Sequence, residues 1–146
     1  DRDIGTSAGF IRLFLKGKYP GAPRLQFPVV DVRDVAKMHR LAVERDVPTG
    51  GRYLGSADCL WLVEIARAIR NGLGPAARKV PDRELPDWLV KIVAIFDGAA
   101  RQTAPDLGKD FQVDNSRTRR ALGMEFIPAP DSAVALARSL IDLKLV

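Results

Sequence analysis

The sequence predicts an α/β fold that is mostly helical, with a few short strands. Three β-branched valines close a predicted strand over residues 25–32. The apolar residues that follow are spaced three and four apart, which predicts a helix over residues 34–45. Asp34 lies between the two, where its carboxylate would cap the first free backbone N–H groups of the helix. A strand that leads directly into a capped helix is typical of α/β domains.

The rest of the chain is interpreted from the same two signals. Apolar spacing predicts further helices between Thr6 or Ser7 and Gly17, from Ser56 or Asp58 to about Gly72, from Trp88 to about Arg101, between Asp114 and Gly123, and from Asp131 or Ser132 onward. Short strands are expected at residues 52–55, 79–81 and 109–113. Pro28 cannot donate a ladder hydrogen bond, so its strand should lie at an edge or contain a bulge.

Length and composition describe an ordinary globular chain. Its 146 residues are enough for one domain with its own core, and no apolar run is long enough to span a membrane. The net charge of +5 would suit an anionic partner, but basic and acidic residues alternate along the chain, which favours a basic surface without a dedicated partner. Cys59 is the sole cysteine, which fits a reducing, cytoplasmic location and predicts a buried, inert thiol.

Four separated stretches carry a family resemblance. They are residues 7–23, the run Val-Asp-Val-Arg-Asp-Val-Ala at 30–36 with a histidine three residues later, residues 51–55, and residues 114–123. In this order the stretches resemble the extended short-chain dehydrogenases/reductases, in the branch that holds dihydroflavonol reductases and bacterial aldehyde reductases. The resemblance implies that residues 1–146 form the substrate-binding half of an oxidoreductase. A Rossmann-type half that binds NADP (or NAD) would precede Asp1, and the missing initial methionine also favours a fragment.

The same resemblance implies roles for four residues. Ser7 would contact the cofactor phosphates at a helix N-terminus, with plain capping as the alternative. Phe10, Pro28 and Trp88 would line the pocket of a small carbonyl substrate, an aldehyde or a ketone. Proline at position 28 cannot supply a polar contact, which argues against a flavonoid-type substrate.

The motifs of catalysis itself are missing from the sequence. The family pairs a tyrosine with a lysine four residues later, but Pro23 follows Tyr19 at that distance and Ala57 follows Tyr53. The glycines at 50, 51 and 55 lack the spacing of a dinucleotide-binding turn. His39 is the sole histidine, which predicts a structural role at a domain seam and no metal site. We therefore expect no catalytic residue in this chain and no activity from it alone.

Other functions remain alternatives. The chain could be part of a nucleotide-sugar epimerase or dehydratase, or a non-catalytic interaction domain that uses the apolar run 89–96. That run should pack against the missing half or against a second subunit, which leaves a homodimer open. It is too short to span a bilayer, and a membrane-surface role is the weaker interpretation. A DNA-binding role for Arg117, Arg119 and Arg120 lacks interleaved aromatics. We expect neither nucleic acid nor membrane as a partner.

Overall fold

A computed structural model describes residues 5–45, 47, 50–96 and 98–146. The fold is α/β and mostly helical, as predicted. The elements are, in chain order, α1 (Thr6–Leu15), β1 (Gln26–Val29), α2 (Val32–Glu44), β2 (Asp58–Trp61), α3 (Leu62–Leu73), η1 (Gly74–Ala77), α4 (Asp87–Phe96), α5 (Gly98–Thr103), η2 (Ala104–Asp106), α6 (Ser116–Leu122) and α7 (Ala129–Asp142).

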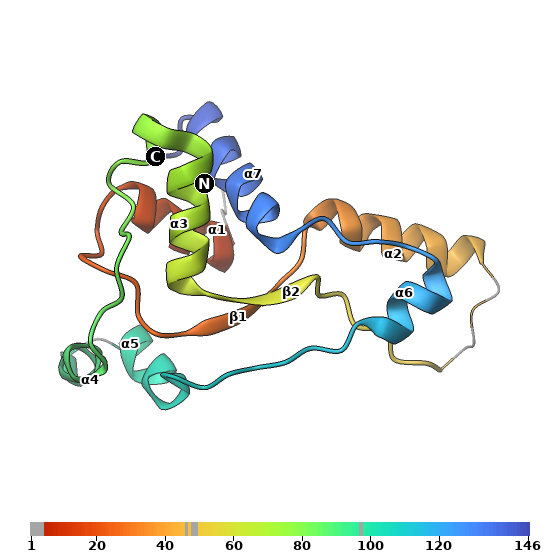
Figure 1. The fold of residues 1–146 in the computed structure, drawn as a ribbon, viewed down its shortest axis with the longest axis horizontal. Helices are drawn as coiled ribbons and strands as arrows, with labels where there is room; N and C mark the ends of the chain where they lie inside the picture. Colours follow the sequence, from red (N-terminus) through yellow and green to blue (C-terminus); the bar gives the residue numbers. More distant parts are fainter. Residues whose placement is uncertain (1–4, 46, 48–49, 97) are drawn as a thin grey trace.

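The molecule is elongated, with a helical body at each end (Figure 1). α1, α3 and α7 pack together at one end, with α4 and α5 to one side of them, and α2 and α6 form the other end. The antiparallel ribbon of β1 and β2 runs between the two ends, with Gln26 opposite Trp61 and Val29 opposite Asp58. Pro28 lies opposite Cys59 in this two-stranded sheet, where both strands are edges. The predicted edge position of Pro28 is therefore confirmed.

The main hydrophobic core lies between α1, α3 and α7. Phe14, Ile69, Val80 and Ala137 are fully buried there. Gly17 ends α1 as predicted, because its positive φ of 68° lets the N–H of Lys18 reach the carbonyl of Leu13 at 3.0 Å. The residues of this core come mainly from α1, β2, α3 and α7, so the core joins segments that are far apart in sequence at the larger end of the molecule.

A second, smaller core joins α2 to α6. Leu41, Leu122, Met124 and Phe126 are buried in it. Buried Thr118 donates a hydrogen bond of 2.9 Å from its hydroxyl to the carbonyl oxygen of Leu54. The α2–α6 end thus has few buried apolar side chains, and hydrogen bonds such as this one also hold it together.

Two buried carboxylates fix the start of α2, and the expected cap was wrong. Asp31, not Asp34, is the N-cap: its Oδ1 accepts from the backbone N–H of Arg33 at 2.9 Å. The helix begins at Val32 because β1 ends at Val29, three residues earlier than expected. Asp34 lies in the first turn, 4% exposed, and its Oδ2 accepts from the backbone N–H of Ile127 at 2.7 Å. Asp34 therefore connects α2 to the segment that leads into α7.

Other helix starts also differ from the expectation. α1 has Gly5 as its N-cap and no side-chain capping bond, so neither Thr6 nor Ser7 caps it. α3 begins only after β2 and continues to Leu73, where Gly74 (φ 52°) ends it. α7 begins at Ala129, before the expected start at Asp131 or Ser132. Pro130 lies in its first turn, where a proline is well tolerated, so the helix includes residues that were expected to form a linker.

The expected strands at 52–55, 79–81 and 109–113 do not form within the described residues. The strand before α3 lies at Asp58–Trp61 instead. The long helix expected from Trp88 to about Arg101 is two helices, α4 and α5, and Asp97 between them lies outside the described residues. Arg101 donates to the carbonyl oxygens of Ala94 at 3.1 Å and Ile95 at 2.6 Å, which satisfies the C-terminal end of α4.

Close helix packing at Gly72 gives a first prediction. A Cβ added there would lie 2.7 Å from Cγ1 of Val134, so α3 and α7 approach closely at this glycine. Gly72→Ala should lower the free energy of unfolding by about 1–2 kcal/mol, because the clash outweighs the better helix propensity of alanine. Gly9→Ala in α1 is the matched control, since a Cβ there meets nothing within 4 Å; it should raise stability by about 0.5–1 kcal/mol. Urea denaturation of both variants measures this, and equal effects would contradict the assigned packing.

The charge of Asp31 gives a second prediction. Hydrogen bonds from the Arg33 guanidinium hold the pKa of Asp31 well below its usual range and outweigh the opposing effect of burial; the backbone N–H of Arg33 and the hydroxyl of Ser132 add to the lowering. A depressed folded pKa means that the carboxylate stabilises the fold above its unfolded pKa of about 3.9, and that this stability is lost as the pH falls through the folded value.

Asp31→Asn should therefore destabilise the chain at neutral pH, by about 1–3 kcal/mol. The difference from the wild type should shrink as the pH falls below about 4. Thermal denaturation between neutral and acidic pH measures both effects. Asp142→Asn is the control, since Asp142 is exposed on α7 and belongs to none of the ion pairs in the described residues. A constant difference at all pH values would contradict the role of the charge.

Candidate functional site

A hollow of about 360 Å³ lies beside β1. Its walls are Leu25, Gln26, Phe27, Pro28, Thr103, Asp106 and Phe111. β1 supplies one wall, and the end of α5, η2 and the segment after it supply the other. Of the residues that the sequence singled out for the substrate, Pro28 is the one found here. We therefore take this hollow as the candidate site.

Hydrogen bonds hold the two walls of the hollow together. The side-chain carbonyl of buried Gln26 accepts from the backbone N–H of Phe111, and the N–H of Gly108 donates to the carbonyl of Arg24 at 2.8 Å. Gly108 has a φ of 72°, a conformation that glycine adopts readily, so it allows the turn after η2. Arg24 in turn pairs with Asp87 at 2.9 Å, which connects the hollow to the start of α4.

The lining of the hollow is apolar with a few polar groups. Phe27 and Phe111 are 41% and 40% exposed, so their rings are available to a ligand. The hydroxyl of Thr103 donates to the carbonyl of Ala100 at 3.2 Å, and Asp106 pairs with Lys109 at 2.8 Å. Such a surface suits the apolar part of a small molecule, with polar groups at its edge to orient it.

The other predicted site residues lie elsewhere. Ser7 is exposed in the first turn of α1. Phe10 is half-buried and packs against Phe14 and Tyr19, with ring centroids 4.6 and 5.5 Å away. Trp88 is 64% exposed at the start of α4. The structure therefore does not bring Ser7, Phe10 and Trp88 together with Pro28 around one hollow, and sequence spacing missed the contribution of Phe27 and Phe111.

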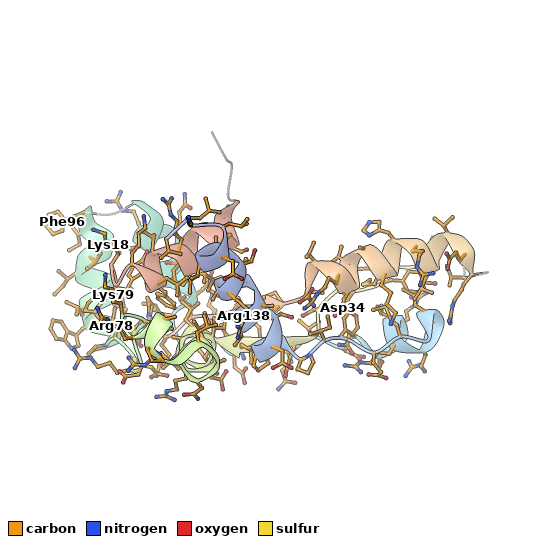
Figure 2. The ribbon with its side chains drawn as sticks, turned by 90° about the horizontal axis from the view of Figure 1, so that it is seen from above. Lys18, Asp34, Arg78, Lys79, Phe96 and Arg138 are labelled. Atoms are coloured by element: carbon orange, nitrogen blue, oxygen red, sulfur yellow. The ribbon has the colours of Figure 1, made fainter. Side chains whose placement is uncertain are left out.

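A second, open hollow of about 850 Å³ lies between α3 and α7. Its lining residues are Ala68, Asn71, Gly72, Pro130, Asp131, Val134, Ala135, Arg138, Ser139, Asp142 and Leu143. Arg138, labelled in Figure 2, lies on α7 and is one of these lining residues. None of the residues predicted to bind cofactor or substrate lines it.

The remaining candidate side chains have structural partners. His39 is exposed on α2, and its Nδ1 donates to the carbonyl of Val35 at 2.8 Å on its own helix. Arg119 bonds the side chain of Asn115 at 2.8 Å and lies over the ring of Phe126. Arg117 lies over the ring of Tyr53, 5.2 Å from its centroid. Within the described residues, no group of three His, Cys, Asp or Glu side chains could hold a metal ion.

Cys59 is half-buried on β2, and its environment raises the pKa of its thiol. Burial is the main cause, and the negative charges of Asp58 and Asp110 add to it. A raised pKa keeps the sulfur protonated at neutral pH, which supports an inert thiol over a nucleophile.

The thiol gives a third prediction. Iodoacetamide at neutral pH should modify Cys59 in the folded chain at least about tenfold more slowly than it modifies free glutathione, because little thiolate is present. The rate should rise as the pH is raised, and urea-unfolded chain should react at the ordinary rate. Mass spectrometry of timed samples measures this. Fast modification of the folded chain at neutral pH would contradict an inert thiol.

Comparison with known proteins shows a relationship that the structure by itself does not reveal. No family model matches the chain. Ketoreductase azaE of Aspergillus niger is 34% identical over 126 residues, which are 84% of this chain and 32% of that protein. The chain is related to a reductase. It spans about a third of the length of that curated relative.

A solved structure supports the fold. The crystal structure of gox2253 matches with a TM-score of 0.73 and 22% identity, over 97% of this chain and 46% of that chain. At this level of identity the likeness concerns the fold alone.

No described helix combines the length and the apolar character needed to cross a membrane.

Proposed function

We propose that this chain is the substrate-side part of an NAD(P)-dependent oxidoreductase that reduces an aldehyde or a ketone. The observation that carries the proposal is the 34% identity to a ketoreductase, because it extends over 84% of the chain. In this proposal the remaining part of a longer enzyme supplies the cofactor site and the catalytic tyrosine and lysine. The finer assignment is to the extended short-chain dehydrogenases/reductases of the dihydroflavonol reductase type, on the motifs quoted above.

The cofactor, NADP or NAD, is held mainly by that other part, and Ser7 contributes to its phosphates. The position of Ser7 supports this role. Its hydroxyl is exposed in the first turn of α1 and does not cap that helix, so it is available beside free backbone N–H groups. Hydride passes from the cofactor to the carbonyl carbon, and a proton from the other part of the enzyme completes the alcohol.

The substrate lies with its apolar portion against the hollow beside β1. Phe27, Pro28 and Phe111 offer ring and methylene surface, and Gln26 holds Phe111 in place through its side-chain carbonyl. Phe10 and Trp88 complete the pocket wall only if the other part of the enzyme approaches α1 and α4. The chain therefore contributes shape and apolar contact rather than proton transfer.

A fourth prediction tests this proposal. The test protein is the longer product of the gene that encodes this chain, assayed by loss of NADPH or NADH absorbance with a panel of aldehydes and ketones. Phe27→Ala should raise KM about tenfold and change kcat little, because it removes apolar contact that substrate and transition state share. Val43→Ala is the control, since Val43 is 88% exposed on α2 and lies far from the hollow.

The 146-residue chain alone should oxidise neither cofactor, because no tyrosine in it has a lysine four residues later. Turnover by the chain alone would contradict the division of labour proposed here. Turnover of nucleotide sugars but not of carbonyl compounds by the longer protein would replace the reductase with an epimerase or dehydratase.

A further inference from the structure

The open hollow between α3 and α7 has no part in the proposed function. The two helices lie side by side (Figure 1), and the hollow of about 850 Å³ follows them. We call this surface, with the lining residues named above, the α3–α7 groove. Its middle is lined by Ala68, Gly72, Val134 and Ala135, which carry small or short side chains. Such a surface lets another helix approach closely, because interaxial distances depend on the side chains at the contact.

Three charged side chains lie in a line along α7 in this groove. Asp131, Arg138 and Asp142 are seven and four residues apart, so the α-helix places them on one face. All three are exposed, and none takes part in an ion pair within the part of the chain that the structure describes. The groove therefore presents charges of both signs that are available to a partner.

The spacing of these charges is symmetric about the middle of the groove. Asp131 lies three residues before Val134, and Arg138 lies three residues after Ala135. A two-fold axis that passes between Val134 and Ala135 makes two copies of α7 antiparallel and places Asp131 of each copy opposite Arg138 of the other. Every contact across such an axis occurs twice. We propose that the α3–α7 groove is the interface between two copies of this chain, with two Asp131–Arg138 ion pairs across it.

Charge complementarity favours a second copy over other occupants of the groove. A partner with charge of one sign would match either Asp131 or Arg138 and oppose the other, whereas an antiparallel copy of α7 pairs with both. The half-buried side chains of Val134 and Ala135 then lie between the two ion pairs and lose their remaining contact with water. Asp142 lies beyond these pairs, one turn farther along α7, and stays in solvent.

This interface differs from the one that the sequence left open. The sequence offered the apolar run 89–96 to the missing half or to a second subunit, whereas the proposal uses α3 and α7 and leaves that run to the other part of the enzyme. The proposal does not depend on the reductase function, because its tests measure association and not turnover.

The fifth prediction concerns the association of the same longer protein, measured by sedimentation equilibrium. The wild type should dimerise, and Arg138→Asp should weaken dimerisation at least about tenfold, because two attractions become two repulsions. Asp131→Arg should weaken it by a similar factor. The combined variant should restore the dissociation constant to within about threefold, because it exchanges the charges and keeps both pairs. Lys37→Asp is the control, since Lys37 is exposed on α2 and belongs to no ion pair among the described residues; it should leave dimerisation unchanged.

A crosslink tests the position of the two-fold axis directly. Ala135→Cys should give a disulfide-linked dimer under a mild oxidant, because this residue lies next to its own copy. Ala36→Cys, at an exposed alanine on α2, is the matched control and should give no more crosslink than the wild type. Circular dichroism checks that each variant folds, and the crosslink decides the matter even if a charge variant does not fold. A monomer at all concentrations, a dimer that both single charge reversals leave intact, or no crosslink at Ala135→Cys would overturn the proposal.

Discussion

The buried carboxylates of Asp31 and Asp34 are the contacts on which the relation between the two ends of the molecule depends. Asp31 caps α2, is bonded twice by the Arg33 guanidinium at 2.8 and 2.7 Å, and interacts with Ser132 on α7. Asp34 lies in the first turn of α2, and its carboxylate accepts a hydrogen bond from the backbone N–H of Ile127, just before α7. A buried carboxylate is tolerated when its oxygens are hydrogen-bonded. These hydrogen bonds therefore fix the residue at which α2 begins after β1. They also fix the position of the segment before α7 relative to the start of α2.

Local signals in the sequence predicted the helices well, because helix formation leaves a regular apolar period and glycine marks helix ends. Gly17 and Gly123 were correctly identified, and Gly123 has the left-handed values φ 51° and ψ 46°. The cap of α2 was misassigned because two aspartates lie three residues apart, and only the end of β1 decides between them. The strands at 52–55 and 109–113 failed for a different reason. Strand formation depends on a partner, and the described chain offers none to these segments.

The hollow beside β1 could be predicted only at Pro28. Phe111 lies 85 residues from Gln26 in sequence, and the bond between them depends on tertiary packing that no local pattern records. Phe27 could not be predicted for a simpler reason, because an apolar residue in a strand is usually buried in the core. In the structure Phe27 is 41% exposed and lines the hollow. The relationship to a reductase came from sequence similarity over most of the chain, because no local geometry in the described residues records it.

The small core at the α2–α6 end has a consequence for dynamics. With four buried apolar side chains, that end gains little from burial and relies on single polar contacts such as Thr118 to Leu54 and Asp34 to Ile127. Regions with few apolar contacts open at lower free energy than the core that orders a domain. Amide hydrogens of α2 and α6 will therefore exchange with solvent before those of α3 and α7. The chain behaves as a stable helical body that carries a lobe able to open by itself.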